Sequence, residues 1–230
     1  MESNTFELIL LGCTTIAVGK EASADGSTMT THTCDCRVCD FRLVYVPAKD
    51  HKPGEMRPVF QFFEEYPRIV SAERAPAYAP LPGQEPSIVG YIPEVEHTYA
   101  YFDGVYAVIN EHQLGIGECT CAAKTYAKSK LEGGEALFDV AALSRVAAER
   151  CKTAREAIRL MGELAVKYGY YGWGETLTVI DPNEVWVFDI LATPDGKSAG
   201  KTRISAGNLL PSLRYLYRIN RQRTGNHYHR

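Results

Sequence analysis

The stretch CTTIAVGKEASADGSTMTTHTCD, residues 13–35, decides the fold that we assign to this chain. β-branched residues are frequent at 14–18 and 28–33, and the sequence Ala-Asp-Gly-Ser at 24–27 between them is a strong turn signal. We therefore expect a β-hairpin whose first strand begins at Cys13. A cysteine followed by two threonines so close to the amino terminus also predicts that Cys13 becomes the first residue of the mature chain, after removal of residues 1–12.

A cysteine in the first position carries two reactive groups on one residue. Its thiol is a nucleophile, and its α-amine has an unperturbed pKa of about 8, which suits a general base. The amine can take the thiol proton, so no histidine partner is needed. The sulfur then attacks an amide carbonyl, backbone N–H groups hold the oxyanion, and the amine later protonates the leaving group.

Strand-like and helix-like patterns follow the hairpin. Strands are expected at 41–46, 98–109, 114–121, 175–180 and 184–191, and helices at 136–150 and from the capping box Thr153–Glu156 to Gly169. Asn110 is expected to serve the turn after 98–109, and the Pro-, Gly- and Tyr-rich segment 49–96 to form an ordered surface excursion. Strands, a helix pair and strands again predict an α+β fold with helices covering a mainly antiparallel sheet.

Composition indicates a soluble globular protein of one large domain. The chain has 230 residues, of which 45% are hydrophobic and 23% are charged, and its net charge is −3. Residues 201–230 carry seven Lys/Arg and no Asp/Glu, and strand patterning stops before them, so 192–230 is expected to be a basic tail. The tail lacks Gly-rich or aromatic-stacking motifs, so we expect no nucleic-acid partner.

The apolar segment 6–11 is too short to cross a membrane and has no basic region before it. We therefore expect a cytoplasmic protein without a membrane partner. The sequence Leu-Leu-Gly-Cys at 10–13 nevertheless resembles the cleavage box of a lipoprotein signal, which leaves export or lipid anchoring open.

Seven cysteines, an odd number, indicate reduced thiols rather than a disulfide scaffold. Five of them form two clusters, Cys34-x-Cys36-x-x-Cys39 and Cys119-x-Cys121, so structural zinc is one interpretation. Because C-x-C spacing on a strand simply puts two sulfurs on one face, we favour free or buried thiols and expect no bound metal. No phosphate-binding or cofactor motif is found either, so no cofactor is expected.

Several stretches together resemble the N-terminal-nucleophile cysteine dipeptidases, the family of bacterial dipeptidase A and the secernins, more distantly related to bile salt hydrolases and penicillin V acylases. They are CTTIAVGK at 13–20, ADGST at 24–28, NEHQLGIGE at 110–118, YGYYG at 168–172 and DPNEVWVFD at 181–189. Their order and spacing agree with the family pattern. The resemblance covers about residues 13–191, apparently only the N-terminal half of such a protein.

The resemblance implies an αββα sandwich and hydrolysis of dipeptides with a free amino terminus. Cys13 carries over as nucleophile and, through its α-amine, as base. Asp35 matches the acidic position that steadies that amine in related acylases. Glu118 and Thr120 fall where those acylases place an oxyanion-hole element, so both are predicted to face substrate. His32 stands where many relatives have arginine and is predicted to give substrate a hydrogen bond.

This chain departs from the family beyond residue 191, where relatives continue for about as many residues again and this one turns into the basic tail. Three hypotheses follow. The first is a cysteine dipeptidase that is matured at Cys13 and acts on small peptides, with a homo-oligomer left open. The second is a non-catalytic, secernin-like or truncated interaction protein. The third is a zinc-stabilised binding module.

Overall fold

The computed structural model describes residues 13–35, 43–61, 87–104, 106–121 and 125–192, and the backbone of two strands at 203–208 and 216–220. The predicted amino-terminal hairpin is confirmed. Its strands are β1 (Thr14–Val18) and β2 (Met29–His32), which pair antiparallel, and a short 3₁₀ turn, η1 (Lys20–Ala22), follows β1. Asp25 Oδ1 accepts hydrogen bonds from the amide and hydroxyl of Ser27, and this holds the turn.

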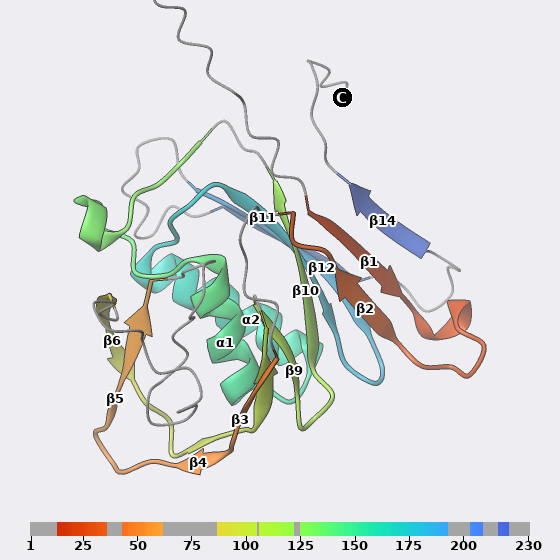
Figure 1. Cartoon of the computed structure of the whole chain (residues 1–230), viewed down its shortest axis with the longest axis horizontal. Helices are drawn as coiled ribbons and strands as arrows, with labels where there is room; N and C mark the ends of the chain where they lie inside the picture. The colour runs from red at the N-terminus through yellow and green to blue at the C-terminus, as the bar shows by residue number, and fades with distance from the viewer. Residues whose placement is uncertain are drawn as a thin grey trace, which may run out of the picture.

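The main sheet has seven strands in the order β13-β12-β11-β10-β9-β8-β3, and each strand pairs antiparallel with its neighbours (Figure 1). Its members are β3 (Val44–Val46), β8 (Tyr101–Asp103), β9 (Ala107–Asn110), β10 (Gly115–Cys121), β11 (Gly174–Ile180), β12 (Val185–Leu191) and β13 (Arg203–Asn208). A smaller sheet has the order β14-β1-β2, with β14 (Leu216–Asn220) beside β1.

The segment 49–96 contains two further strand pairs. They are β4 (Lys49–Asp50) with β7 (His97–Thr98), and β5 (Met56–Phe60) with β6 (Ile88–Pro93). The expected excursion is therefore ordered at both of its ends. Its middle, 62–86, lies outside the described residues.

Two helices, α1 (Val140–Arg150) and α2 (Ala154–Tyr168), are the long helices of the described residues, beside a 3₁₀ turn, η3 (Lys130–Glu132). The predicted capping box is confirmed, since Thr153 and Glu156 each bond to the other's backbone. Helix α1 begins at 140 rather than 136, because the Asp139 side chain accepts a hydrogen bond from Ala142 N and caps it there. Phe138 instead forms a bridge with Tyr170.

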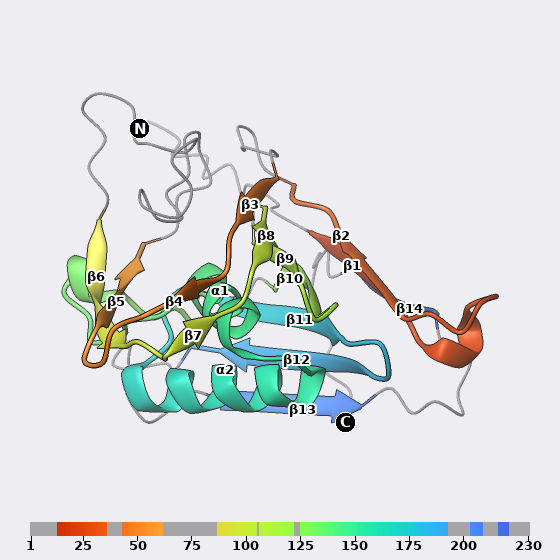
Figure 2. The same cartoon turned by 90° about the horizontal axis from the view of Figure 1, so that it is seen from below.

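The main sheet lies between the helices and the small sheet (Figure 2). On one face, Leu177 and Val179 of β11 belong to the same buried core as Leu143 and Met161 of the helices. On the other face, Thr178 Oγ1 bonds to Thr15 Oγ1 at 2.7 Å and to Thr30 Oγ1 at 2.6 Å across the two sheets. The described layers confirm the α+β class, whereas the full αββα sandwich stays a prediction.

Gly117 of β10 explains how closely the two sheets approach. A Cβ built there would lie within 3.0 Å of the hydroxyls of Thr15, Thr30 and Thr178. The sheets therefore need a residue without a side chain at this point, and the hydroxyls use the space to bond to one another.

Two sequence-based expectations were wrong. The run 98–109 is not one strand, because the chain reverses near Gly104, whose amide donates to Tyr106 O, and β8 and β9 then pair as a hairpin. The segment 192–230 was also expected to contain no strands, but it contains β13, which pairs with β12, and β14, which pairs with β1. Both added strands take their hydrogen bonds from a neighbouring strand edge, so their own sequence need not alternate.

None of the helices among the described residues is long and apolar enough to cross a membrane.

Candidate active site

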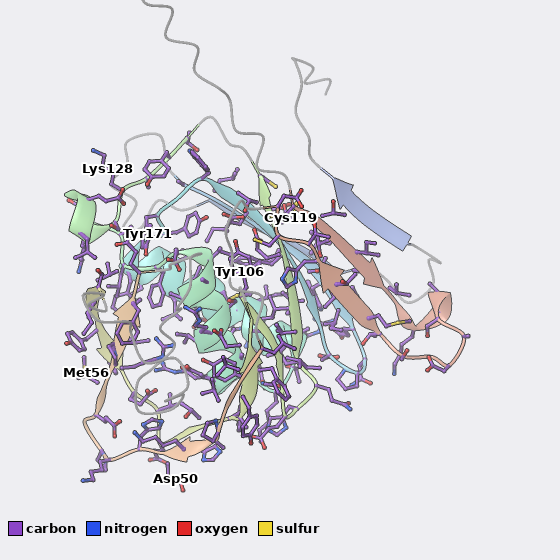
Figure 3. The ribbon with its side chains drawn as sticks, viewed as in Figure 1. Asp50, Met56, Tyr106, Cys119, Lys128 and Tyr171 are labelled. Atoms are coloured by element: carbon purple, nitrogen blue, oxygen red, sulfur yellow. The ribbon has the colours of Figure 1, made fainter. Side chains whose placement is uncertain are left out.

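Cys13 lies at the start of β1 and lines a cavity of about 220 Å³. Its side chain is only 4% exposed. The cavity extends past the ends of β10 and β11 to the start of α1, and tyrosines form much of its wall, among them Tyr106 and Tyr171, which Figure 3 labels. A buried sulfur beside a cavity that opens to solvent is the arrangement that a nucleophile of a small-molecule site requires.

The surroundings of Cys13 favour its thiolate. A hydrogen bond from the Cys34 thiol is the largest cause, and backbone groups of Asp35 and Thr120 and the Thr120 hydroxyl add to it. Burial opposes them, but the net effect lowers the pKa of Cys13 from its usual 9.0 to about 6. The backbone groups beside the sulfur are also where an oxyanion formed by thiolate attack would need donors.

Asp35 lines the same cavity and is linked to the backbone next to Cys13. Thr33 Oγ1 accepts a hydrogen bond from Thr14 N at 3.0 Å and donates one to Asp35 Oδ1 at 3.4 Å. On the other side, Cys13 O accepts a hydrogen bond of 2.9 Å from Cys119 Sγ, and Figure 3 labels Cys119 where β1 meets β10. Cys13 is therefore fixed on both sides, and Asp35 is linked through Thr33 to the amide of Thr14, the residue that follows Cys13.

Glu118 and Thr120 lie on the helix-facing side of β10 and join a third residue, Glu175 of β11, which pairs with Thr120 across the strands. Glu118 Oε1 accepts from Thr120 Oγ1 at 3.0 Å. Glu118 is fully buried behind the cavity wall, whereas Thr120 and Glu175 line the cavity. Thr120 thus lines the same cavity as Cys13, and Glu118 lies one layer behind it.

Both buried carboxyl groups have a raised pKa. Burial is the main cause for both, and it raises the pKa of Glu118 to about 7. The pKa of Glu175 is raised well above its usual value by burial and by its hydrogen bond and charge interaction with Glu118. The pair therefore holds a proton near neutral pH.

His32 lies away from this cavity. It lines a second cavity, of about 540 Å³, and its ring packs edge-on against Tyr106 at a centroid distance of 6.0 Å. Burial lowers the pKa of His32, so the ring is neutral at neutral pH. The structure therefore does not bring His32 together with Cys13, Asp35 and Thr120 in one cavity.

Asn110 serves the predicted turn: its Oδ1 accepts hydrogen bonds from His112 N and Leu114 N, and its amide donates to Ala148 O and Cys151 O. All four contacts are made to the backbone. Asn110 is therefore a structural residue, and this role was predicted from the sequence.

The sequence did not identify Glu175, Tyr106, Asp139 or Tyr171 as cavity residues. Tyr171 donates a hydrogen bond of 2.8 Å to Asp139 Oδ2, and Asp139 also caps α1. The motif YGYYG at 168–172 carried one available signal, because two of its tyrosines line the cavity.

The cysteines described here give no metal cluster. Among the described residues, no group of three or more His, Cys, Asp or Glu side chains is arranged to hold a metal ion. Cys119 and Cys121 both lie in β10, as C-x-C spacing on a strand predicts, and Cys121 shares a hydrogen bond with Thr176 Oγ1. Cys36 and Cys39, the other ligands of the zinc hypothesis, lie outside the described residues.

One comparison with known proteins identifies the family. Residues 12–205 match the family model of peptidase family C69. The match begins next to Cys13 and continues past residue 191, where the sequence-based resemblance ended. Because it covers most of the 230 residues, the chain belongs to peptidase family C69.

Proposed function

We propose that this member of peptidase family C69 is a cysteine-type dipeptidase in which Cys13 is the nucleophile. One observation carries the proposal: the thiol with a pKa lowered to about 6 lies at a cavity, one residue after the family match begins. The cavity volume of about 220 Å³ suits a short peptide better than a long chain.

The proposed mechanism requires removal of residues 1–12, which would give Cys13 a free α-amine. In the 230-residue chain this nitrogen belongs to a peptide bond and cannot act as a base. Once free, the amine takes the thiol proton, and Asp35, on the same cavity, stabilises the ammonium that forms.

The thiolate then attacks the carbonyl carbon of the peptide bond, and backbone groups of Asp35 and Thr120 stabilise the oxyanion. When the tetrahedral intermediate collapses, the C–N bond breaks and the ammonium of Cys13 gives its proton to the leaving amine. The acyl group remains on sulfur as a thioester. Water, deprotonated by the same amine, hydrolyses the thioester and restores the thiol.

Two measurements on Cys13 test this function. Intact-mass analysis should find a chain that begins at Cys13 and takes up one equivalent of a thiol-reactive dipeptide analogue there. In the mature protein, Cys13→Ala should reduce kcat/KM for dipeptides by at least about 10³-fold. Its melting temperature should stay within a few degrees of the wild type, because only the sulfur is lost.

Cys151→Ala is the matched control, since Cys151 is a buried thiol that contacts the helices rather than the cavity. It should keep full activity in its folded state. An unprocessed, unlabelled wild-type chain would instead support the non-catalytic interaction protein. Undiminished hydrolysis by Cys13→Ala would show that Cys13 is not the nucleophile.

A further inference from the structure

The proposed mechanism leaves one buried cluster without a role, the carboxyl pair Glu118 and Glu175. The two side chains hydrogen-bond to each other on the helix-facing side of β10 and β11. One oxygen of each, Glu118 Oε2 and Glu175 Oε2, is buried and has no hydrogen-bond partner among the described residues. Buried carboxyl oxygens without a partner are costly and rare, so a group that pairs with them is expected to arrive from outside.

Glu175 is the member of the pair that a ligand can reach. It lines the cavity that also contains Cys13, yet its side chain is only 8% exposed. Glu118 is fully buried behind it. A molecule in the cavity would therefore contact Glu175 directly, and Glu118 would act on it through Glu175.

The other carboxyl groups of the cavity already have partners. Asp139 accepts from Ala142 N and from Tyr171 Oη, one bond on each oxygen. Glu132 likewise accepts from Tyr126 Oη and from Ser129 N. Asp35 is exposed to water. Among the described residues of the cavity, Glu175 thus stands apart as the carboxyl whose buried Oε2 receives no hydrogen bond from a fixed protein donor.

The charge of the cavity indicates what the ligand carries. Four carboxyl residues line it, namely Asp35, Glu132, Asp139 and Glu175, and its described lining contains no lysine, arginine or histidine. A cationic group with N–H donors would supply both the missing charge and the missing hydrogen bonds. With no three-ligand cluster among the described residues, an ammonium fits this place better than a metal ion.

We propose that Glu175 binds the α-ammonium group of the substrate, with Glu118 as a positioning residue behind it. This inference rests on the proposed dipeptidase function and names the group that recognises a free amino terminus. Because Glu175 and Cys13 line the same cavity, an amine held at Glu175 would bring the first peptide bond of a short substrate toward the sulfur. The site thereby selects the bond to be cleaved.

The protonation of the pair agrees with a ligand of one positive charge. Burial raises the pKa of both groups, that of Glu118 to about 7, so the empty pair keeps a proton near neutral pH. A bound ammonium would stabilise the charged pair and make it release that proton. Binding of the amine should therefore tighten as the pH rises through about 7.

The test measures binding rather than turnover, so that it can fail separately from the proposed function. The probe is a dipeptide with an N-methylated peptide bond, which resists hydrolysis, and its counterpart with an acetylated amino terminus. Calorimetry on the mature wild-type protein should find the free amine bound about 100-fold more tightly than the acetylated peptide. Glu175→Gln should reduce this ratio to about threefold or less.

Glu132→Gln is the matched control, because it removes a cavity carboxyl whose oxygens already have partners, and it should keep the preference. Glu175→Asp, which keeps the charge, should retain part of it, and it remains informative where the Gln variant does not fold. Equal binding of both peptides by the wild type, or a full preference in Glu175→Gln, would overturn the proposal. A wild type that prefers the free amine but hydrolyses no dipeptide would refute only the dipeptidase function.

Discussion

Arg145 of α1 and Asp103 of β8 meet at 2.9 Å, whereas on β10 and β11 of the same sheet Glu118 meets Glu175. Both places are buried. In the first, opposite charges pair, and a neighbouring pair, Arg57 with Glu149 at 2.6 Å, repeats the pattern. In the second, like groups face each other and each keeps an oxygen without a partner among the described residues.

The pKa values reflect this difference. Burial alone would lower the pKa of Arg145, but the Asp103 carboxylate outweighs it and raises that pKa. At Glu118, burial raises the pKa and no cation opposes it. The matched pair is complete within the fold, so its role is structural. The unmatched pair is completed only by protons or by a ligand, which is typical of a functional site.

The largest effect is expected at the matched pair. Arg145→Ala would leave the fully buried Asp103 carboxylate without its cation, and this should destabilise the protein by about 3–5 kcal/mol. Urea unfolding of the variant and the wild type measures the loss.

Arg155→Ala is the control for Arg145→Ala, because the Arg155–Glu184 pair is partly exposed, and it should cost about 1 kcal/mol or less. If the two variants lose equal stability, the buried pair has no special structural role and the comparison fails.

A change of opposite sign is expected at the unmatched pair. The pKa of Glu118 rises from its usual 4.5 to about 7 on folding, so the stability it contributes is full below about 4.5 and is lost as the pH rises through about 7. Glu118→Gln cannot ionise. It should therefore be more stable than the wild type at pH 8, by about 3 kcal/mol, and differ from it by no more than about 1 kcal/mol at pH 5.

Urea unfolding at both pH values tests this sign. Glu132→Gln serves as the control, because the pKa of Glu132 is lowered rather than raised, chiefly by the Ser129 backbone, and it should not gain stability at pH 8. A Glu118→Gln variant that is destabilised equally at pH 5 and pH 8 would mean that the carboxyl pair is a structural contact like the ion pairs.

The amino-terminal hairpin, the α2 capping box and the 174–191 hairpin could be predicted because their signals are local. The turn at Asp25, the box formed by Thr153 and Glu156, and the turn at Asp181 each act within a few residues of themselves. The reversal at Gly104 was missed, because a run of strand-forming residues does not reveal where it folds back on itself. Strands β13 and β14 were missed because neighbouring strand edges support them.

The candidate site was predicted only in part, for a related reason. Cys13 and Asp35 belong to one motif, so a resemblance in that motif finds both. Glu175 reaches the cavity through strand register, which places it opposite Thr120, a residue far away in the sequence. In sequence, Glu175 is one acidic residue at the start of a strand. Only pairing and burial reveal that it faces Glu118 without a cation.

The smallest effect is expected at Cys34, the thiol that donates a hydrogen bond to Cys13. Cys34→Ala removes the hydrogen bond that contributes most to lowering the pKa of Cys13, while the backbone groups of Asp35 and Thr120 remain. The pKa of Cys13 should therefore rise from about 6 part of the way to its usual 9.0, and alkylation of Cys13 at pH 6 should slow about tenfold. The alkylation rate reports the fraction of thiolate, so it should increase as the pH rises through the pKa of Cys13 and level off above it.

Cys151→Ala should leave this pH profile unchanged, because Cys151 packs in the helix-side core away from the cavity. An unchanged profile in Cys34→Ala would mean that the backbone groups alone lower the pKa of Cys13, and that Cys34 has no part in activating the nucleophile.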